Sequence, residues 1–197
     1  MKKHSIFLFL ALVANNALSI GNPFSSKPTP QMAEIKELDM VGPHPIKLAL
    51  IFKSLRDRKK LWINQALLYG PSGTGKSKYA REIAKAADCN FIEIDCSGFI
   101  DVASGIKTLK DVFAQAKHGG PLLPNFDPSK PTVISIEEVN VISNQYKEST
   151  NNTAIALWAS LDRIEGSNIF VFLSTNYREQ LHPQLIRRLA SNRTSAN

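Results

Sequence analysis

A glycine-rich run between a short apolar segment and a helix-like segment is the feature that most constrains this chain. Residues 70–77 are GPSGTGKS and fit the spacing G-x-x-x-x-G-K-[ST]. The apolar residues 66–69 before the run predict a buried strand, and residues 77–87 after it predict a helix. Such glycines let successive N–H groups face one anion, which the helix N-terminus also favours. The pattern predicts a phosphate-binding loop, the alternative being a glycine-rich turn with a chance Lys-Ser.

The loop suggests a role for each of its residues. Lys76 is expected to reach the β- and γ-phosphates of a nucleotide, and the Ser77 hydroxyl is expected to bind Mg²⁺. We therefore predict a nucleotide and Mg²⁺ as ligands of this loop. The remaining residues expected to contact the nucleotide are Gly70, Pro71, Ser72, Gly73, Thr74 and Gly75.

The rest of the chain alternates between strand and helix patterns. Further strands are predicted at residues 91–95, 132–136 and 168–173. Helices are predicted at residues 45–60, 106–117, 150–163 and 180–190. Alternation of this kind implies a mostly parallel sheet with helices on both faces. The predicted fold class is therefore α/β, a three-layer sandwich of the P-loop NTPase type.

Composition is that of a globular domain with a modest positive charge. The 197 residues are 43% hydrophobic and 21% charged, with a net charge of +7. That excess admits nucleic acid as a partner, but the cations of residues 53–60 fit a solvated helix face. The sequence contains no basic stripe interleaved with aromatic residues, which argues against nucleic-acid binding.

The N-terminal segment differs from the rest and predicts a separate domain boundary. Residues 1–19 combine a basic start, an apolar stretch and a small-residue cleavage pattern, as in a secretory signal peptide. An interfacial anchor or an apolar tail is the alternative, since the stretch is short for a membrane span. Residues 20–31 are expected to be a linker and residues 32–197 the core domain. The segment favours export or membrane association, whereas ATP chemistry favours the cytosol, so localisation stays open.

Polar side chains follow the third and fourth predicted strands. Glu137 and Glu138 end the third strand, where one carboxylate can serve Mg²⁺ and the other can accept a proton from water attacking the γ-phosphate. Asn176 follows the fourth strand and can donate to the γ-phosphate. Arg187 and Arg188 can act as charge supplied to a neighbour's nucleotide. Each has a simpler alternative, in which the two glutamates are only a solvated strand end, the asparagine is a turn residue, and the two arginines are a surface helix terminus.

In this order and spacing, these elements resemble the AAA+ ATPases over about residues 39–193. Residues 39–42 (DMVG) look like the family's adenine-contacting segment, which implies nucleotide contacts for Val41 and Gly42. Residues 106–117 look like the helix before the second acidic motif, and residues 174–188 are similar to the sensor-1 and arginine-finger region.

The resemblance implies a role for each downstream polar residue. Glu138 matches the catalytic glutamate, Asn176 matches sensor 1, and Arg187 and Arg188 match the finger pair. Glu137 stands where the family usually has Asp, and its extra methylene is expected to shift the carboxylate. Because Mg²⁺ demands near-ideal geometry but often meets carboxylates through water, we expect weaker metal binding or slower turnover without complete loss.

Two further departures concern loops and the chain end. Residues 97–105 form a short predicted loop, in which Phe99 looks like a buried residue rather than a pore aromatic. The chain ends before the family's fifth strand and helical lid, which predicts a truncated AAA+ core whose first strand, residues 66–69, is an exposed edge.

These observations predict ATP binding and Mg²⁺-dependent ATP hydrolysis by a module that acts in an oligomer. The oligomer is expected to be a homo-oligomer or to include a second chain that completes the fold, with a protein as one candidate substrate. The alternative is a nucleotide-binding interaction module, a truncated or relic copy with little or no hydrolysis. A P-loop small-molecule kinase fits poorly, because the sequence shows neither an acceptor pocket nor an arginine-rich lid.

Overall fold

Five strands form one sheet in the computed structural model, in the order β1-β2-β5-β4-β3. The structure describes residues 9–11, 53, 55–57, 64–99, 101–146 and 151–191. Strands β2, β5, β4 and β3 are parallel, and β1 pairs antiparallel with β2. The strands are β1 (Phe9–Ala11), β2 (Gln65–Tyr69), β3 (Asn90–Asp95), β4 (Thr132–Glu137) and β5 (Ile169–Thr175).

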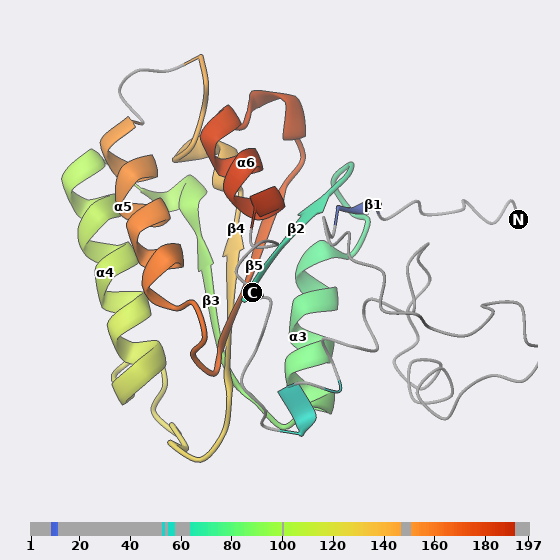
Figure 1. Cartoon of the computed structure of the whole chain (residues 1–197), viewed down its shortest axis with the longest axis vertical. Coiled ribbons are helices and arrows are strands. Elements are labelled where there is room, and N and C mark those ends of the chain that lie inside the picture. The colour runs from blue at the N-terminus through green and yellow to red at the C-terminus, as the bar shows by residue number, and fades with distance from the viewer. Residues whose placement is uncertain are drawn as a thin grey trace, which may run out of the picture.

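Helices cover both faces of this sheet (Figure 1). Helices α4 (Val102–His118) and α5 (Asn151–Arg163) lie side by side on one face, and α3 (Lys76–Ala86) covers the other. Helix α6 (Pro183–Ser191) follows β5 and lies at the upper end of the sheet in Figure 1. Three short 3₁₀ turns complete the described part, η1 (Cys96–Gly98), η2 (Val139–Val141) and η4 (Arg178–Gln180). The predicted α/β three-layer sandwich is therefore confirmed.

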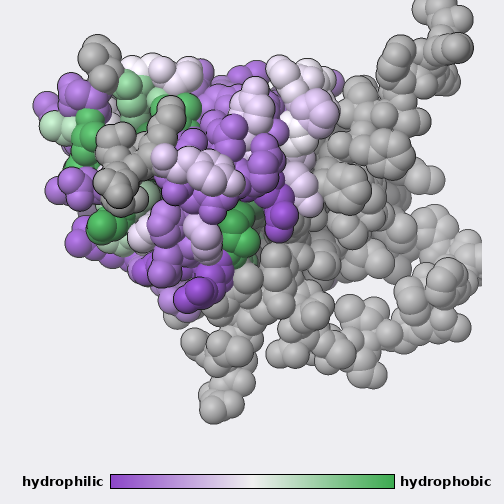
Figure 2. Space-filling model, turned by 90° about the horizontal axis from the view of Figure 1, so that it is seen from above, coloured by the Kyte–Doolittle hydropathy of each residue, from purple (hydrophilic) through white to green (hydrophobic). Residues whose placement is uncertain are grey.

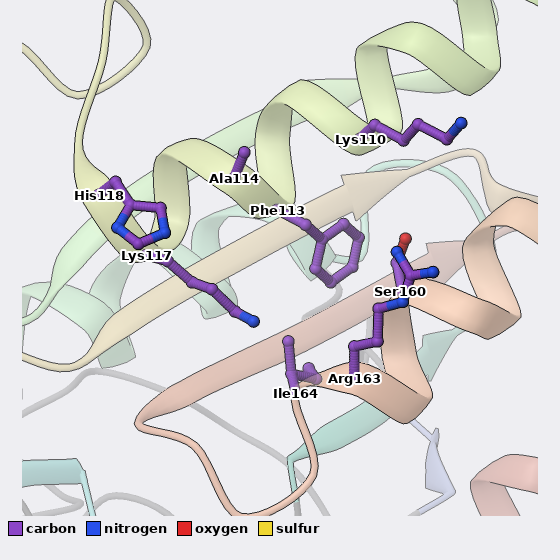
Figure 3. A pocket seen from close by; sticks show the side chains of 8 residues that line it. All are labelled: Lys110, Phe113, Ala114, Lys117, His118, Ser160, Arg163 and Ile164. Carbon is purple, nitrogen blue, oxygen red and sulfur yellow. The ribbon is translucent and has the colours of Figure 1, made fainter.

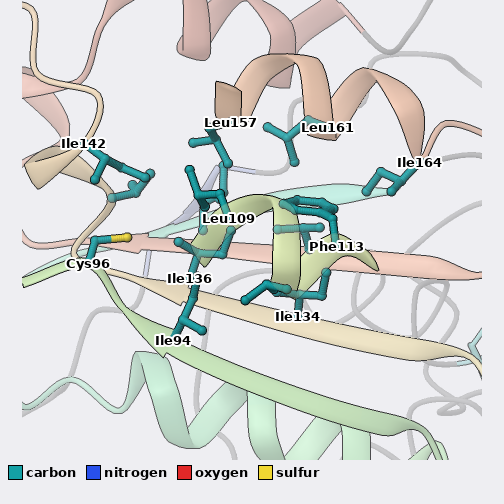
Figure 4. Packing of buried hydrophobic residues seen from close by; sticks show 14 of the residues in the cluster. Ile94, Cys96, Leu109, Phe113, Ile134, Ile136, Ile142, Leu157, Leu161 and Ile164 are labelled. Carbon is teal, nitrogen blue, oxygen red and sulfur yellow. The ribbon is translucent and has the colours of Figure 1, made fainter. Parts of the chain in front are cut away.

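Alternating side chains of the central strands build two apolar cores. In β5, Phe170 and Phe172 face α3, whereas Val171 and Leu173 face α4 and α5. Figure 4 shows the second core, in which Leu109 of α4 packs among the aliphatic side chains of β4 and α5. Because both faces are covered, the central strands are almost continuously apolar, as parallel sheets require.

Helix α4 begins four residues earlier than the sequence pattern predicted. Asp101 caps it, because its carboxylate accepts from Ser104 N at 2.8 Å and Ser104 Oγ accepts from Asp101 N at 3.3 Å. The predicted loop at residues 97–105 is therefore shorter than expected. Phe99 within it is half-buried and packs against the core, as predicted.

The prediction that residues 66–69 form an exposed edge is wrong. Strand β1 pairs with β2 in the register Phe9↔Tyr69, Leu10↔Leu68 and Ala11↔Leu67. Along residues 67–69, that side of β2 is therefore paired rather than free. Strand β1 falls within the segment predicted to be signal-like, most of which lies outside the described residues.

Other N-terminal predictions lie largely outside the described residues. Of the helix predicted at residues 45–60, the structure describes only residue 53 and residues 55–57, with Leu55 fully buried in the α3-side core. The linker predicted at residues 20–31 lies wholly outside. Among the helices that the structure describes, none is long and apolar enough to cross a membrane.

A cavity of about 350 Å³ lies between α4 and α5, with Phe113 in its wall (Figure 3). Its rim is basic, because Lys110, Lys117 and Arg163 all contribute to it. Ser160 is the buried polar side chain of its lining, and its hydroxyl donates to the Ala156 carbonyl at 2.9 Å. The lining therefore presents flexible surface cations rather than fixed polar groups that would select a ligand.

Truncation of Leu109 to alanine should destabilise the fold. Its side chain is 0% exposed, so Leu109→Ala should cost about 2–5 kcal/mol of unfolding free energy. Lys107→Ala, an exposed change on the same helix, should stay within about 0.5 kcal/mol. Urea unfolding of the two variants measures the difference, and equal losses would contradict the described core.

Candidate functional site

The glycine-rich loop connects the carboxyl end of β2 to the first turn of α3. Gly73 and Gly75 have φ values of 78° and 83°, in the left-handed region that L side chains rarely adopt. A Cβ at either position would meet no heavy atom within 4 Å. Backbone conformation, and not lack of space, therefore explains glycine at these two positions.

The start of α3 leaves donors available for an anion. Gly75 occupies the N-cap with no side-chain hydrogen bond, and the first turn has no acidic residue. Within the described part of the chain, the backbone N–H groups of Gly75, Lys76 and Ser77 donate to no protein acceptor. Unpaired N–H groups at a helix N-terminus, together with the helix dipole, favour a negatively charged group.

Lys76 lies inward of the loop and is only 7% exposed. Its Nζ donates to the carbonyls of Gly70 at 3.0 Å and Pro71 at 3.1 Å, and to Asn176 Oδ1 at 2.6 Å. Burial lowers the pKa of Lys76, while the carboxylates of Glu138 and Glu137 act in the opposite direction. The ammonium group thus lies close to two carboxylates and donates hydrogen bonds to protein oxygens.

Asn176 links this ammonium group to Glu138. Its Nδ2 donates to Glu138 Oε1 at 2.8 Å, while its Oδ1 accepts from Lys76. Both ends of the amide therefore have fixed partners of opposite charge. The three side chains come from three separate segments, after β2, after β4 and after β5.

Glu138 adopts an uncommon backbone conformation. Its φ is 52° and its ψ is 44°, which is left-handed and sparsely populated for a residue other than glycine. Strain of this kind costs about 1–3 kcal/mol and is concentrated at functional sites. The turn directs the Glu138 carboxylate toward Asn176 directly after the last residue of β4.

Glu137 is held by two serine hydroxyls that the sequence analysis did not identify. Ser135 Oγ donates to Glu137 Oε1 at 2.6 Å, and Ser174 Oγ donates to Glu137 Oε2. The two serines are 0% and 1% exposed. Ser135 interrupts an apolar run two residues before Glu137, on the same face of the strand, which is the signal that could have identified it.

A second buried hydrogen bond fixes the turn that carries Asn176. Thr175 Oγ1 donates to Asn140 Oδ1 at 2.7 Å, and Tyr177 N donates to Thr175 Oγ1 at 3.0 Å. These contacts join the end of β5 to η2, directly after Glu138. The positions of Asn176 and Glu138 therefore depend on each other beyond their direct contact.

The two arginines of α6 have different surroundings. Arg187 is exposed. Arg188 lies over the Trp158 ring, 5.3 Å from its centroid, and its Nη2 is 3.4 Å from Asp162 Oδ2. These contacts of Arg188 are to α5 and not to the glycine-rich loop, so the structure separates the predicted pair into one solvent-facing and one packed residue.

The oxygen donors at the site suit Mg²⁺. Ser77 is the second residue of α3, and with Glu137 it offers a hydroxyl and a carboxylate, which are the hard ligands that this ion prefers. No group of three or more His, Cys, Asp or Glu among the described residues could hold a metal by itself. Mg²⁺ is usually bound through one or two carboxylates with phosphates and waters, so this donor set fits.

Figure 2 shows the molecule from above, onto the end of the sheet where β2, β4 and β5 terminate. Hydrophilic residues dominate the coloured part of this face, with small hydrophobic areas between them.

Val41 and Gly42, the predicted adenine-contacting residues, lie outside the described residues.

Comparison with known families agrees with this geometry. The model of the family described as "ATPase family associated with various cellular activities (AAA)" matches residues 66–195. The chain belongs to this family. The resemblance inferred from the motifs is thus confirmed. In an AAA domain, the expected ligand of the phosphate-binding loop is a nucleotide.

Curated proteins named as regulatory subunits of the 26S proteasome are similar to this chain. The chain is 30% identical over 165 residues to a 26S proteasome regulatory subunit 8 homolog of Schizosaccharomyces pombe, covering 78% of this chain and 38% of that protein. An Encephalitozoon cuniculi homolog is 31% identical over 158 residues, with the same two coverages. The chain thus spans less than two fifths of the length of these relatives.

A solved structure shows the same fold. The crystal structure of the FIGL-1 AAA domain in complex with ADP aligns with a TM-score of 0.53 and 24% identity, covering 71% of this chain and 46% of that one. At this identity the similarity supports the AAA fold and not a particular activity.

The charges around Lys76 allow a direct test of the site geometry. Glu138→Gln should lower the pKa of Lys76 further, because it removes a nearby negative charge while keeping an acceptor for Asn176. An NMR titration of the Lys76 side-chain Cε resonance measures the pKa. Glu165→Gln, an exposed change after α5, should leave it unchanged, and an unaltered value in Glu138→Gln would contradict the described contacts.

Proposed function

We propose that this chain binds ATP with Mg²⁺ and, as one subunit of an oligomer, hydrolyses the bond between its β- and γ-phosphates. The observation that carries the proposal is the hydrogen-bonded series Lys76–Asn176–Glu138 beside the N-terminus of α3. Cation, amide and carboxylate are the groups that phosphate binding and activation of a water require. Membership of an ATPase family supports the same activity.

The loop and α3 would bind the phosphates. The N–H groups of Gly75, Lys76 and Ser77 are available donors, and the Lys76 ammonium would exchange carbonyl partners for phosphate oxygens. Ser77 and Glu137 would hold Mg²⁺, which when bound neutralises charge on the β- and γ-phosphates. Exchange of neutral carbonyls for a charged oxygen also favours the protonated form of Lys76.

Glu138 would act as the general base toward the attacking water. Asn176 donates to one of its carboxylate oxygens, which leaves the other to accept the proton. Because Asn176 also contacts Lys76, it would keep the base at a fixed distance from the γ-phosphate. We favour this proposal over a binding module without hydrolysis, because Glu138 lies in hydrogen-bond contact with an amide that also contacts Lys76.

Arg187 would supply positive charge to the nucleotide of a neighbouring subunit. It is exposed on α6, whereas Arg188 is engaged with Trp158 and Asp162 of its own subunit. We therefore assign the trans-acting role to Arg187 and an anchoring role to Arg188. The relatives are named as regulatory subunits of the 26S proteasome, which supports action within an assembly and a protein substrate.

Two substitutions should separate binding from hydrolysis. Lys76→Ala should abolish both the ATP-induced rise in Tm and phosphate release, because it removes the buried cation. Glu138→Gln should retain the Tm shift but lower phosphate release by about 100-fold or more. Lys78→Ala, an exposed lysine on the same helix, is the control and should change neither. Wild-type turnover in Glu138→Gln would exclude Glu138 as the base.

Mixing two inactive variants tests whether Arg187 acts in trans. Arg187→Ala and Glu138→Gln should each release little phosphate alone. A mixture should regain part of the activity, because some interfaces then combine an intact Glu138 with an intact Arg187 from the neighbour. If Arg187 acted within its own subunit, mixing would restore nothing. Arg188→Ala should instead lower Tm, since it removes the contact over Trp158.

A further inference from the structure

Glu137 and its two serine partners form a three-residue cluster at the ends of neighbouring strands. Ile136 of β4 pairs with Leu173 of β5, so Glu137 and Ser174 are the next residues of the two strands. Ser135 lies two residues back on β4 and therefore on the same face as Glu137. Each carboxylate oxygen of Glu137 accepts from a different hydroxyl.

This arrangement fixes a side chain that would otherwise be too free for a metal ligand. Glutamate has one more rotatable bond than aspartate, so its carboxylate can occupy more positions. Two donors on two different oxygens define both the position and the plane of the carboxylate. Each oxygen retains a second lone pair, which can face a cation or its bound water.

Burial makes the cluster specific to a carboxylate of this length. Ser135 and Ser174 are almost completely buried. Each hydroxyl can donate one hydrogen bond, and in both serines Glu137 accepts it. Aspartate at position 137 is one methylene shorter and would not reach both hydroxyls in the same pose. A buried hydroxyl that loses its acceptor is costly, so the two serines and the glutamate depend on one another.

We propose that Ser135 and Ser174 are positioning residues that adapt this site to glutamate at position 137. Their hydroxyls hold the Glu137 carboxylate, which together with the Ser77 hydroxyl would bind Mg²⁺. The proposal rests on the proposed nucleotide function and extends it to two residues that contact neither nucleotide nor metal. It accounts for an active-site carboxylate that is longer than the aspartate usual in the family.

Metal affinity and nucleotide affinity, measured separately, test this role. Mn²⁺ serves as the paramagnetic probe, and electron paramagnetic resonance measures its binding to the full chain saturated with a non-hydrolysable ATP analogue. Ser135→Ala and Ser174→Ala should each weaken Mn²⁺ binding by about 10-fold, the scale at which partners of metal ligands act. Nucleotide affinity in EDTA should stay unchanged. Ser160→Ala, a buried serine bonded within α5, is the matched control and should alter neither affinity.

A double-substitution cycle tests the dependence on side-chain length. Glu137→Asp should weaken Mn²⁺ binding, and adding Ser174→Ala to it should cause little further loss, because the shorter carboxylate no longer engages both hydroxyls. Equal Mn²⁺ affinity in wild type and Ser174→Ala would overturn the proposal. So would a full additional loss from Ser174→Ala in the Glu137→Asp background, or unchanged Mn²⁺ affinity in Glu137→Gln.

The two proposals fail in distinguishable ways. If nucleotide affinity in EDTA is absent, or survives Lys76→Ala, the proposed nucleotide site is wrong. If nucleotide affinity behaves as expected but Mn²⁺ affinity does not depend on the serines, only the positioning role is wrong.

Discussion

Parallel pairing of β2, β5 and β4 is the constraint on which the site depends. Carboxyl ends of parallel strands meet at one edge of a sheet, so segments distant in sequence become neighbours there. Lys76 and Asn176 are 100 residues apart, and Asn176 and Glu138 are 38 apart, yet each pair shares a hydrogen bond. Slippage of either strand pair by one residue would turn these side chains to the opposite face.

Opposite charges close together reduce the free-energy cost of burying this polar cluster at the edge of an apolar core. Burial alone disfavours the ammonium form of Lys76, and the carboxylates of Glu137 and Glu138 oppose that effect. The carboxylates in turn accept from Ser135, Ser174 and Asn176, so each has a defined partner. A bound polyphosphate would enter a cluster in which donors are already oriented, which reduces the reorganisation that binding requires.

Local patterns in the sequence predicted the elements but not every contact between them. The glycine-rich loop and strands β2 to β5 followed from residue types at fixed spacing, whereas the separate roles proposed for Glu138 and Asn176 came from the resemblance to the family. The serine cluster around Glu137 did not, because it depends on the register between β4 and β5, which no local pattern encodes. The same limit explains β1, whose pairing with β2 joins residues nearly sixty positions apart and removes the predicted free edge. The resemblance assigns Arg187 and Arg188 to one motif, although a helix turns adjacent residues toward different surroundings.

Residues 143–145, which follow the Glu138 turn, and residues 180–182, which lead into α6, form one connected unit. Gln145 N donates to the Gln180 carbonyl at 2.9 Å, and His182 N donates to the Ser143 carbonyl at 2.9 Å. An isolated bridge between Asn144 and Leu181 lies between these two bonds. Backbone pairing of this kind resists sliding, so displacement of the Glu138 turn would carry the start of α6 with it. Arg187 follows within the next two turns. The surface proposed to face a neighbouring subunit is therefore linked through these backbone hydrogen bonds to the residue proposed to activate water in its own site.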